Sequence, residues 1–415
     1  MKITALRTYR FSVPTGQEVR DPHTGQLLCS TCKPWLFLKV ETDAGLCGWG
    51  EEGYATVDRG PTALGAGTWA AAATALSCPG CRTARPGANR PPMESRSMSQ
   101  SSQAQASRDR TEVLRAGRMQ YRTLGATGMV ASEVAFGSHL KRSNIDDRAE
   151  RRQQIRVGIE HGINVFDIYE HSYQQFEPMS EALSPVRDQV LISLVTVWRA
   201  AEEVMDEVEY ALRVFQRDCI DLYRLVLHDN WDDAEKRLQA LARAREQGKV
   251  RAIGAVVHYP AHLLEGLRRY PDLIEYVMVP VSFCAPLVIR EEGPLAGVLR
   301  QSGVGVIAMK PMAAADEESG YIFKLQPQGQ EVEALRRQGM SLGKLAMKYV
   351  LQSDVVTCAL PAMNSVDEVL ENVQASGDGP LTADEQRFLQ LYREEADRAF
   401  PAILGDNDYW VSPWK

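Results

Sequence analysis

The stretch IDLYRLVLHDNWDDAEKRLQALARAREQGKVRAIGAVV, residues 220–257, decides the fold class of this chain. It opens with an apolar β-type run at 220–227 and closes with a second one at 250–257. A helical pattern over residues 234–249 lies between the two runs. A strand, a helix and a second strand in this order indicate a βαβ unit, and such units build a parallel sheet with helical cover.

The same alternation continues through the rest of the chain from Met119 onward. With the two runs above it gives eight expected strands, the other six at residues 132–137, 163–168, 190–197, 274–281, 303–310 and 355–362. Eight βα units are the number for a (β/α)8 TIM barrel. A doubly wound open sheet is the competing α/β architecture, but no G-x-G-x-x-G motif follows any of these strands. We predict a barrel over residues 119–400, followed by a tail at 401–415.

Two segments of different character precede the barrel. In residues 1–54, the runs PWLFLKVET (34–42) and LCGWGEE (46–52) flank turn residues, which predicts a β-hairpin. Residues 55–118 are poor in large apolar side chains over most of their length. Such a segment buries too little apolar surface to offset its ordering entropy, so we expect a largely disordered, low-complexity linker.

The cysteines offer a metal-site hypothesis. Two C-x-x-C pairs, Cys29 with Cys32 and Cys78 with Cys81, have the local spacing of zinc ligands. The gap between the pairs is far longer than the roughly 15–20 residues of a zinc ribbon. We therefore expect unrelated free thiols and no metal site. Three further cysteines, Cys219, Cys284 and Cys358, lie in apolar runs and are predicted to be buried.

Composition excludes few classes of protein. The net charge of -7 and the acidic isoelectric point near 5.7 argue against a dedicated nucleic-acid binder. No apolar run reaches the roughly 18 residues of a membrane span, and the first residues lack the apolar core of a signal peptide. We expect a cytoplasmic protein with a small-molecule substrate and without a nucleic-acid or membrane partner. The oligomeric state stays unknown.

Several ordered motifs carry a resemblance to a known family. They are MQYRTLGATGMVASEVAFG (119–137), GINVFDIYEHSY (162–173), IDLYRLVLH (220–228), GVGVIAMKPM (303–312) and ALPAMNSVDEVLENVQAS (359–376). In this order they resemble the aldo-keto reductase superfamily. The resemblance implies an oxidoreductase that uses NADP(H) or NAD(H) on a carbonyl or alcohol substrate, with the cofactor across the carboxyl ends of the barrel strands.

A second resemblance concerns the start of the chain. WLFLKVETDAGLCGWGEE, residues 35–52, resembles the N-terminal capping domain of the mandelate racemase/enolase superfamily. That family's metal-binding carboxylates and catalytic lysines lie in a following barrel, and we find no such barrel here. The favoured interpretation is a cap fragment and a linker fused ahead of a reductase-like barrel. The alternative from the cap alone is an acid-sugar dehydratase or racemase.

The first resemblance implies a proton relay of aspartate, tyrosine, lysine and histidine. Asp167 matches the aspartate at its strand end. Tyr173 is assigned as the proton donor, although the usual spacing falls on Ser172, and His228 is assigned as the histidine, about two residues late. Tyr173 and Tyr169 as packing residues are the alternative.

The lysine of the relay is missing. Val195 takes its place, and residues 190–230 contain no lysine. We therefore expect Asp167 to be a carboxylate without its cation, which would oppose formation of a tyrosine phenolate. The catalytic tetrad is then eroded, and either His228 or His171 is the acid, or the barrel is a non-catalytic binder of a nucleotide or a partner. If Val195 points inward, Val195→Lys would restore the relay.

The cofactor residues implied by the resemblance are His258, Lys310, Ser365 and Asn372. Apolar Met278 and Val281 occupy places where the family carries groups for the nicotinamide ring. The sequence S-V-D-E at 365–368 predicts a capping box at a helix start. A helix N-terminus attracts phosphate, but the two acids in this first turn oppose a 2'-phosphate.

Overall fold

The computed structural model describes residues 117–138, 148–169, 176–196, 200–314, 322–399 and Trp414, together with the backbone of five strands between residues 3 and 52. The chain divides into two compact units, residues 1–96 and 97–415. The predicted linker lies almost entirely outside the described residues, as do the side chains of both C-x-x-C pairs.

The first unit contains an antiparallel sheet in the order β1-β4-β5, formed by β1 (Ile3–Pro14), β4 (Cys32–Thr42) and β5 (Cys47–Glu52). In the pairing of β4 with β5, Leu36 faces Glu52 and Glu41 faces Cys47. The hairpin predicted from the sequence is therefore confirmed at the level of the backbone. A separate pair is formed by β2 (Val19–Arg20) and β3 (Leu27–Cys29).

The second unit holds the predicted (β/α)8 barrel. Its parallel strands follow one another in chain order around the sheet, and bridges from Val134 to Ala359 and from Gly137 to Ala362 join its two edges. The strands are β8 (Phe136–Gly137), β9 (Val165–Ile168), β10 (Leu191–Thr196), β11 (Ile220–Leu227), β12 (Val250–Val257), β13 (Tyr276–Pro280), β14 (Gly305–Met309) and β15 (Cys358–Leu360). The bounds of β11 and β12 coincide with the predicted runs.

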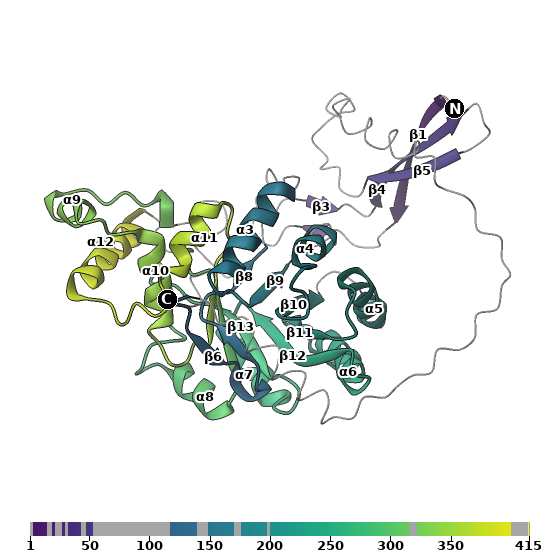
Figure 1. Cartoon of the computed structure of the whole chain (residues 1–415). Helices are drawn as coiled ribbons and strands as arrows, with labels where there is room; N and C mark the ends of the chain where they lie inside the picture. Colours follow the sequence, from purple (N-terminus) through teal and green to yellow (C-terminus); the bar gives the residue numbers. More distant parts are fainter. Residues whose placement is uncertain are drawn as a thin grey trace. The chain divides into compact units, whose positions relative to one another are not determined.

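Helices cover the outside of the sheet (Figure 1). They are α3 (Arg148–Glu160), α4 (Phe176–Leu183), α5 (Val204–Phe215), α6 (Trp231–Glu246), α7 (Pro260–Arg269), α8 (Pro294–Ser302), α9 (Gln330–Arg337), α10 (Leu342–Leu351), α11 (Val366–Val373) and α12 (Ala383–Ala399).

Helix α6 illustrates why these segments are helical. The side chain of Asn230 caps its start by accepting a hydrogen bond from the amide of Asp233. Ala234, Leu238 and Leu241, spaced by four and three residues, are buried against the barrel. Each fully buried leucine of this kind contributes roughly 1.5–3 kcal/mol.

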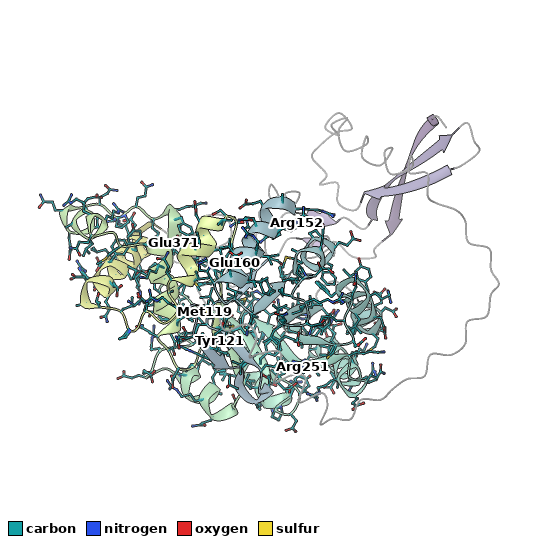
Figure 2. The ribbon with its side chains drawn as sticks, in the orientation of Figure 1. Met119, Tyr121, Arg152, Glu160, Arg251 and Glu371 are labelled. Carbon is teal, nitrogen blue, oxygen red and sulfur yellow. The ribbon has the colours of Figure 1, made fainter. Side chains whose placement is uncertain are left out.

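Polar side chains connect the elements on the outside of the barrel, and several are labelled in Figure 2. Glu371 of α11 accepts hydrogen bonds from the Ser341 hydroxyl and from the amide of Gly343, 3.1 Å away, so it caps α10. Arg251 of β12 pairs with Asp221 of β11 at 3.0 Å. These contacts stabilise the scaffold and lie outside the barrel interior.

A hairpin closes the amino-terminal end of the barrel. It is formed by β6 (Tyr121–Thr123) and β7 (Val130–Ser132), and Leu124 in its turn is fully buried in the interior. A Cβ atom at Gly305, the first residue of β14, would lie 2.6 Å from the Leu124 side chain. The hairpin thus fills this end, and the carboxyl ends of the strands are left for a site.

Two further predictions concern the described residues. Cys284 and Cys358 are buried as expected, whereas Cys219 is partly exposed because it lies in the turn before β11 rather than inside the strand. Within the part of the chain that the structure describes, no helix is long and apolar enough to cross a membrane.

Candidate functional site

The inward face of β9 carries the site. Side chains alternate along a strand, so Val165, Asp167 and Tyr169 share one face. Val165 is buried in the interior cluster, and Tyr169 packs against that cluster while remaining partly buried. On β10, Val195 is 5 % exposed and belongs to the same cluster. The place that the resemblance gives to a lysine therefore does point into the barrel.

Asp167 has a cation in the structure, which corrects the sequence prediction. The guanidinium of Arg224 on β11 binds the carboxylate through two nitrogens, with Nη1 to Oδ1 at 2.5 Å and Nη2 to Oδ2 at 3.1 Å. The Ser193 hydroxyl also donates to Oδ1, at 2.7 Å. The prediction of an unpaired Asp167 was wrong because the search was for lysine on β10, whereas the cation comes from the next strand. An arginine inside the apolar run IDLYRLVL was the available signal.

The ion pair lies in a polar cluster with Tyr276 of β13. Burial alone would lower the pKa of Arg224, but the charge of Asp167 more than offsets this, so the pKa is raised. Burial raises the pKa of Tyr276 well above its ordinary value, and Arg224 offsets only part of the rise. Gly254 provides the space for the ring, since a Cβ atom there would lie 2.3 Å from Cζ of Tyr276.

A cysteine also lies near this cluster. Burial, with a smaller contribution from the Asp167 charge, raises the pKa of the Cys358 thiol to about 12. The thiol therefore stays protonated at neutral pH and is a poor nucleophile. Its position inside the barrel supports a packing role.

Two predicted cofactor residues, His258 and Lys310, lie at the carboxyl ends of β12 and β14. Burial, followed by the charges of Lys310 and His262, lowers the pKa of His258 to about 3, so its imidazole is neutral at neutral pH. The backbone carbonyl of His258 accepts a 2.8 Å hydrogen bond from the indole of Trp414. Lys310 has a φ of 58°, a left-handed conformation that is rare for lysine and concentrated at functional sites.

The other two predicted cofactor residues belong to α11. The Ser365 hydroxyl accepts from the amide of Glu368 at 3.2 Å, and the Glu368 carboxylate accepts from the amide of Asn364 at 2.7 Å. The predicted capping arrangement is thus confirmed, with the carboxylate reaching one residue before the cap. Asn372 is buried on the same helix. The Glu368 carboxylate therefore places a negative charge beside this helix start.

Of the remaining predicted catalytic residues, the structure describes His228, and it lies outside the interior cluster. His228 is exposed in the turn before α6, where its Nδ1 accepts from the amide of Asn230 at 3.1 Å. Its Nε2 lies 4.0 Å from the Asp233 carboxylate. Tyr173 lies outside the described residues, as do Ser172 and His171.

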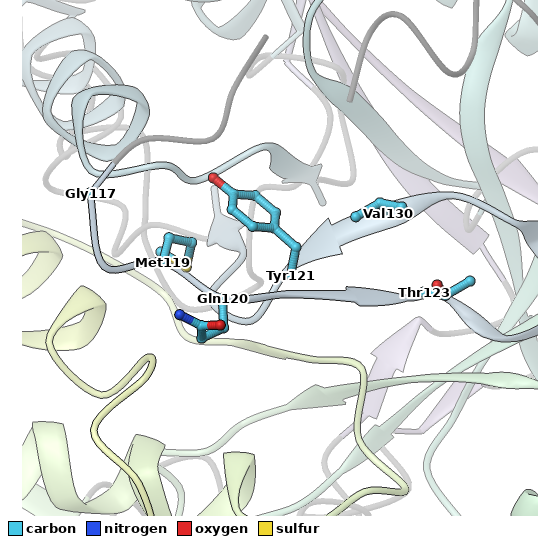
Figure 3. Close-up of a pocket in the computed structure, with 6 residues that line it drawn as sticks. All are labelled: Gly117, Met119, Gln120, Tyr121, Thr123 and Val130. Atoms are coloured by element: carbon cyan, nitrogen blue, oxygen red, sulfur yellow. The ribbon is translucent and has the colours of Figure 1, made fainter. Parts of the chain in front are cut away.

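A pocket opens elsewhere, beside the hairpin at the amino-terminal end (Figure 3). Met119, Gln120 and Tyr121 line it, and the Tyr121 hydroxyl donates to the carbonyl of Gly162 at 2.9 Å. None of the predicted site residues lines this pocket. Among the residues that the structure describes, no group of three or more histidine, cysteine, aspartate or glutamate side chains is placed to hold a metal ion.

Comparison with known proteins covers most of the barrel. The family model described as the aldo/keto reductase family matches residues 134–390. L-glyceraldehyde 3-phosphate reductase of Escherichia coli is 21% identical, over 68% of this chain and 94% of that protein. L-galactose dehydrogenase of Arabidopsis thaliana is 25% identical, over 62% of this chain and 88% of that protein.

Solved structures agree on the fold. An aldo-keto reductase of Bacillus halodurans in its holo form is 24% identical and superposes with a TM-score of 0.53, over 66% of this chain and 96% of that chain. An aldo/keto reductase of Klebsiella pneumoniae in complex with NADP and acetate is 20% identical, with a TM-score of 0.56, over 69% and 98%.

Proposed function

Because the chain belongs to the aldo/keto reductase family, we propose that it is a nicotinamide-dependent oxidoreductase acting on the carbonyl or alcohol group of a small molecule. The reductase and dehydrogenase relatives support this reaction class. Their names point to sugar-derived substrates, and a small polyhydroxylated aldehyde is accordingly the first substrate class to assay.

The observation that carries the proposal is the buried cluster of Asp167, Ser193 and Arg224. A buried ion pair contributes little net stability, since the desolvation of both charges opposes their attraction. Charged groups gathered inside a barrel, near the carboxyl ends of its strands, are typical of active sites. In this proposal Arg224 supplies the positive charge that the family resemblance assigns to a lysine.

The residues at the mouth fit the nicotinamide end of a dinucleotide. His258 is neutral and can donate or accept one hydrogen bond, and Lys310 offers a cation beside it. When bound, the reduced nicotinamide supplies the hydride. Asp167 accepts hydrogen bonds from Arg224 and Ser193, so its role in this proposal is to position the cluster. The resemblance assigns the proton donor to Tyr173 and the orientation of the carbonyl to His228.

The adenosine end favours a cofactor without a 2'-phosphate. Ser365 and Asn372 are the residues that would contact this end. Asp367 and Glu368 bring two negative charges to the first turn of α11, and the Glu368 carboxylate is held there by the Asn364 amide. These charges repel a phosphate. We therefore propose that NADH binds more tightly than NADPH.

The test is a titration of the full-length chain with NADH and NADPH by calorimetry, followed by cofactor consumption with a panel of aldehydes and sugar-derived carbonyls. We expect binding of NADH, weaker binding of NADPH, and turnover of at least one aldehyde. Lys310→Met should weaken binding, whereas Lys236→Met, an exposed lysine on α6, is the matched control. Absence of binding for both nucleotides would contradict the proposal.

A second candidate is a non-catalytic barrel that binds a nucleotide or a protein partner. The inward Val195 favours it, because no lysine reaches the mouth from β10. Binding of NADH without turnover of any carbonyl would support this candidate. The acid-sugar dehydratase or racemase alternative rests on residues 35–52, which lie outside the family match, and it stays an expectation.

A further inference from the structure

Tyr169 has the position of a group that acts at the barrel mouth. It lies two residues after Asp167 and directly beyond β9, so it continues the inward face of that strand. Its side chain packs against the interior cluster and is only partly buried. Its amide donates a 3.2 Å hydrogen bond to the hydroxyl of Ser138, which ties this turn to the end of β8.

Arg224 brings a positive charge that acts on Tyr169. The guanidinium bound to Asp167 interacts electrostatically with Tyr169 as well. A cation close to a tyrosine stabilises the phenolate that remains after the hydroxyl gives up its proton. Asp167, Arg224 and Tyr169 thus form a carboxylate–cation–phenol series, with arginine where the resemblance implies lysine.

The surrounding elements offer no better acid among the described residues. On the neighbouring strands the inward positions nearest the mouth are apolar, at Val195 and Val226. Burial favours the protonated form of Tyr276 strongly, and His258 is neutral. The charged or titratable groups that the described elements bring to the interior and its mouth include Asp167 on β9, Arg224 on β11, His258 after β12, Tyr276 on β13, Lys310 after β14 and Cys358 on β15, and the charge of Arg122 also reaches Cys358.

We propose that Tyr169 is the proton donor of this barrel, an inference that rests on the proposed oxidoreductase function. The carbonyl carbon accepts a hydride from the reduced nicotinamide dinucleotide, and the electron pair of the C=O π bond moves to the oxygen. That oxygen takes the proton of the Tyr169 hydroxyl as its O–H bond breaks. The products are the alcohol, the oxidised dinucleotide and a phenolate beside Arg224, which regains its proton from water.

The first experiment compares Tyr169→Phe with Tyr173→Phe in the full-length protein. We expect Tyr169→Phe to lower kcat by about 10²–10⁴, while the dissociation constant of NADH, measured by calorimetry, changes by less than about twofold because the ring is retained. Tyr210→Phe, on α5 outside the barrel, is the matched control and should keep the wild-type kcat. Loss of turnover in Tyr173→Phe with retention in Tyr169→Phe would overturn the inference.

The second experiment needs neither substrate nor cofactor. Alkaline titration of the 14 tyrosines, followed by the ultraviolet absorbance of phenolate, should show one tyrosine ionising before the others. We expect this first phase to disappear in Tyr169→Phe and to remain in Tyr173→Phe and Tyr210→Phe. A first phase that persists in Tyr169→Phe overturns the inference. The titration tests the Tyr169 assignment even if the wild type reduces no carbonyl. In that case the proposed oxidoreductase function fails, and the titration result for Tyr169 is judged independently of it.

Discussion

Arg224 and Arg151 are both buried in the barrel unit. Arg224 lies inside the barrel, whereas Arg151 lies between α3 and the outer face of the sheet. Arg224 is 1 % exposed, and it binds both oxygens of Asp167. Arg151 is 3 % exposed and lies over the Phe136 ring, with Cζ 5.2 Å from the ring centroid. Its Nη1 donates a long 3.3 Å bond to the carbonyl of Met363, and its Nε and Nη2 have no partner among the described residues.

The difference between these two residues shows that burial alone does not determine whether the pKa of an arginine rises or falls. The Asp167 charge overcomes the desolvation of Arg224 and its pKa is raised. Burial lowers the pKa of Arg151 to about 10, and Glu150 offsets only part of this change. A buried charge with a bidentate partner is a fixed part of the structure, whereas one without a carboxylate partner is an unfavourable element that the fold tolerates.

Removing the positive charge of Arg224 should lower the unfolding free energy more than the other substitutions do. Arg224→Met leaves the Asp167 carboxylate buried without its cation, and we expect unfolding free energy to fall by roughly 3–5 kcal/mol. Chemical denaturation at neutral pH measures it. Arg300→Ala, which breaks an exposed pair with Asp354, is the control and should lower the unfolding free energy far less than Arg224→Met does. Equal effects of the two substitutions would remove the basis of the comparison.

Packing around the cluster gives the next prediction. Gly254→Ala brings a Cβ atom into the ring of Tyr276, and overpacking of this kind should cost about 1–3 kcal/mol. Gly297→Ala is the matched control, because this α8 glycine has nothing within 4 Å of the added atom. Alanine is the better helix former by about 1 kcal/mol, so the control should be stabilising. A neutral Gly254→Ala variant would indicate that Tyr276 does not lie over Gly254.

His258, at the barrel mouth, is a third titratable group whose pKa is shifted by its surroundings. Its pKa is lowered to about 3 in the folded chain, so between its ordinary value and 3 the unfolded chain binds more protons. Unfolding free energy should therefore fall as the pH falls from 7 to 4. Because the side chain keeps some contact with solvent, we expect a loss on the order of 1–3 kcal/mol relative to His258→Gln. Parallel pH profiles for the two proteins would contradict this.

Removing Arg151, on the outer face of the sheet, should change the unfolding free energy least. Arg151→Met deletes two unpartnered nitrogens and keeps most of the apolar stem over Phe136, so we expect a change within about 1 kcal/mol, in either direction. Denaturation in parallel with Arg224→Met gives the contrast directly. A cost of several kcal/mol for Arg151→Met would mean that Arg151 has a partner beyond the described residues.

The sequence predicted the barrel well and its chemistry only in part. Strands such as 220–227 and 250–257 are continuous apolar runs because both of their faces are buried, and their bounds were therefore readable. The short strand β15 covers only three residues of a longer apolar run, since pairing and not hydrophobicity determines where a strand ends. Asp167 was predicted as a site residue from its motif and its strand end, and the structure places it inside the barrel in contact with Arg224.

The partner of Asp167 could not be found in the same way. Arg224 lies 57 residues later in the chain, and its contact depends on the register of three parallel strands. Ser193 is placed opposite Asp167 only by the pairing of β9 with β10. The spacing of residues within one sequence motif does not tell which residues of neighbouring strands lie side by side. With Arg224 in place, the reason for expecting Val195→Lys to restore a missing cation no longer holds.

The pairing of Asp167 with Arg224 is tested most directly by a double-mutant cycle, which compares the unfolding free energies of Asp167→Asn, Arg224→Met and the combined variant. If Arg224 is the cation of Asp167, the two losses overlap, and we predict a coupling energy on the order of 2–3 kcal/mol. Losses that add to within about 0.5 kcal/mol would show that the two side chains do not interact, and would contradict the assignment of Arg224 as the cation of Asp167.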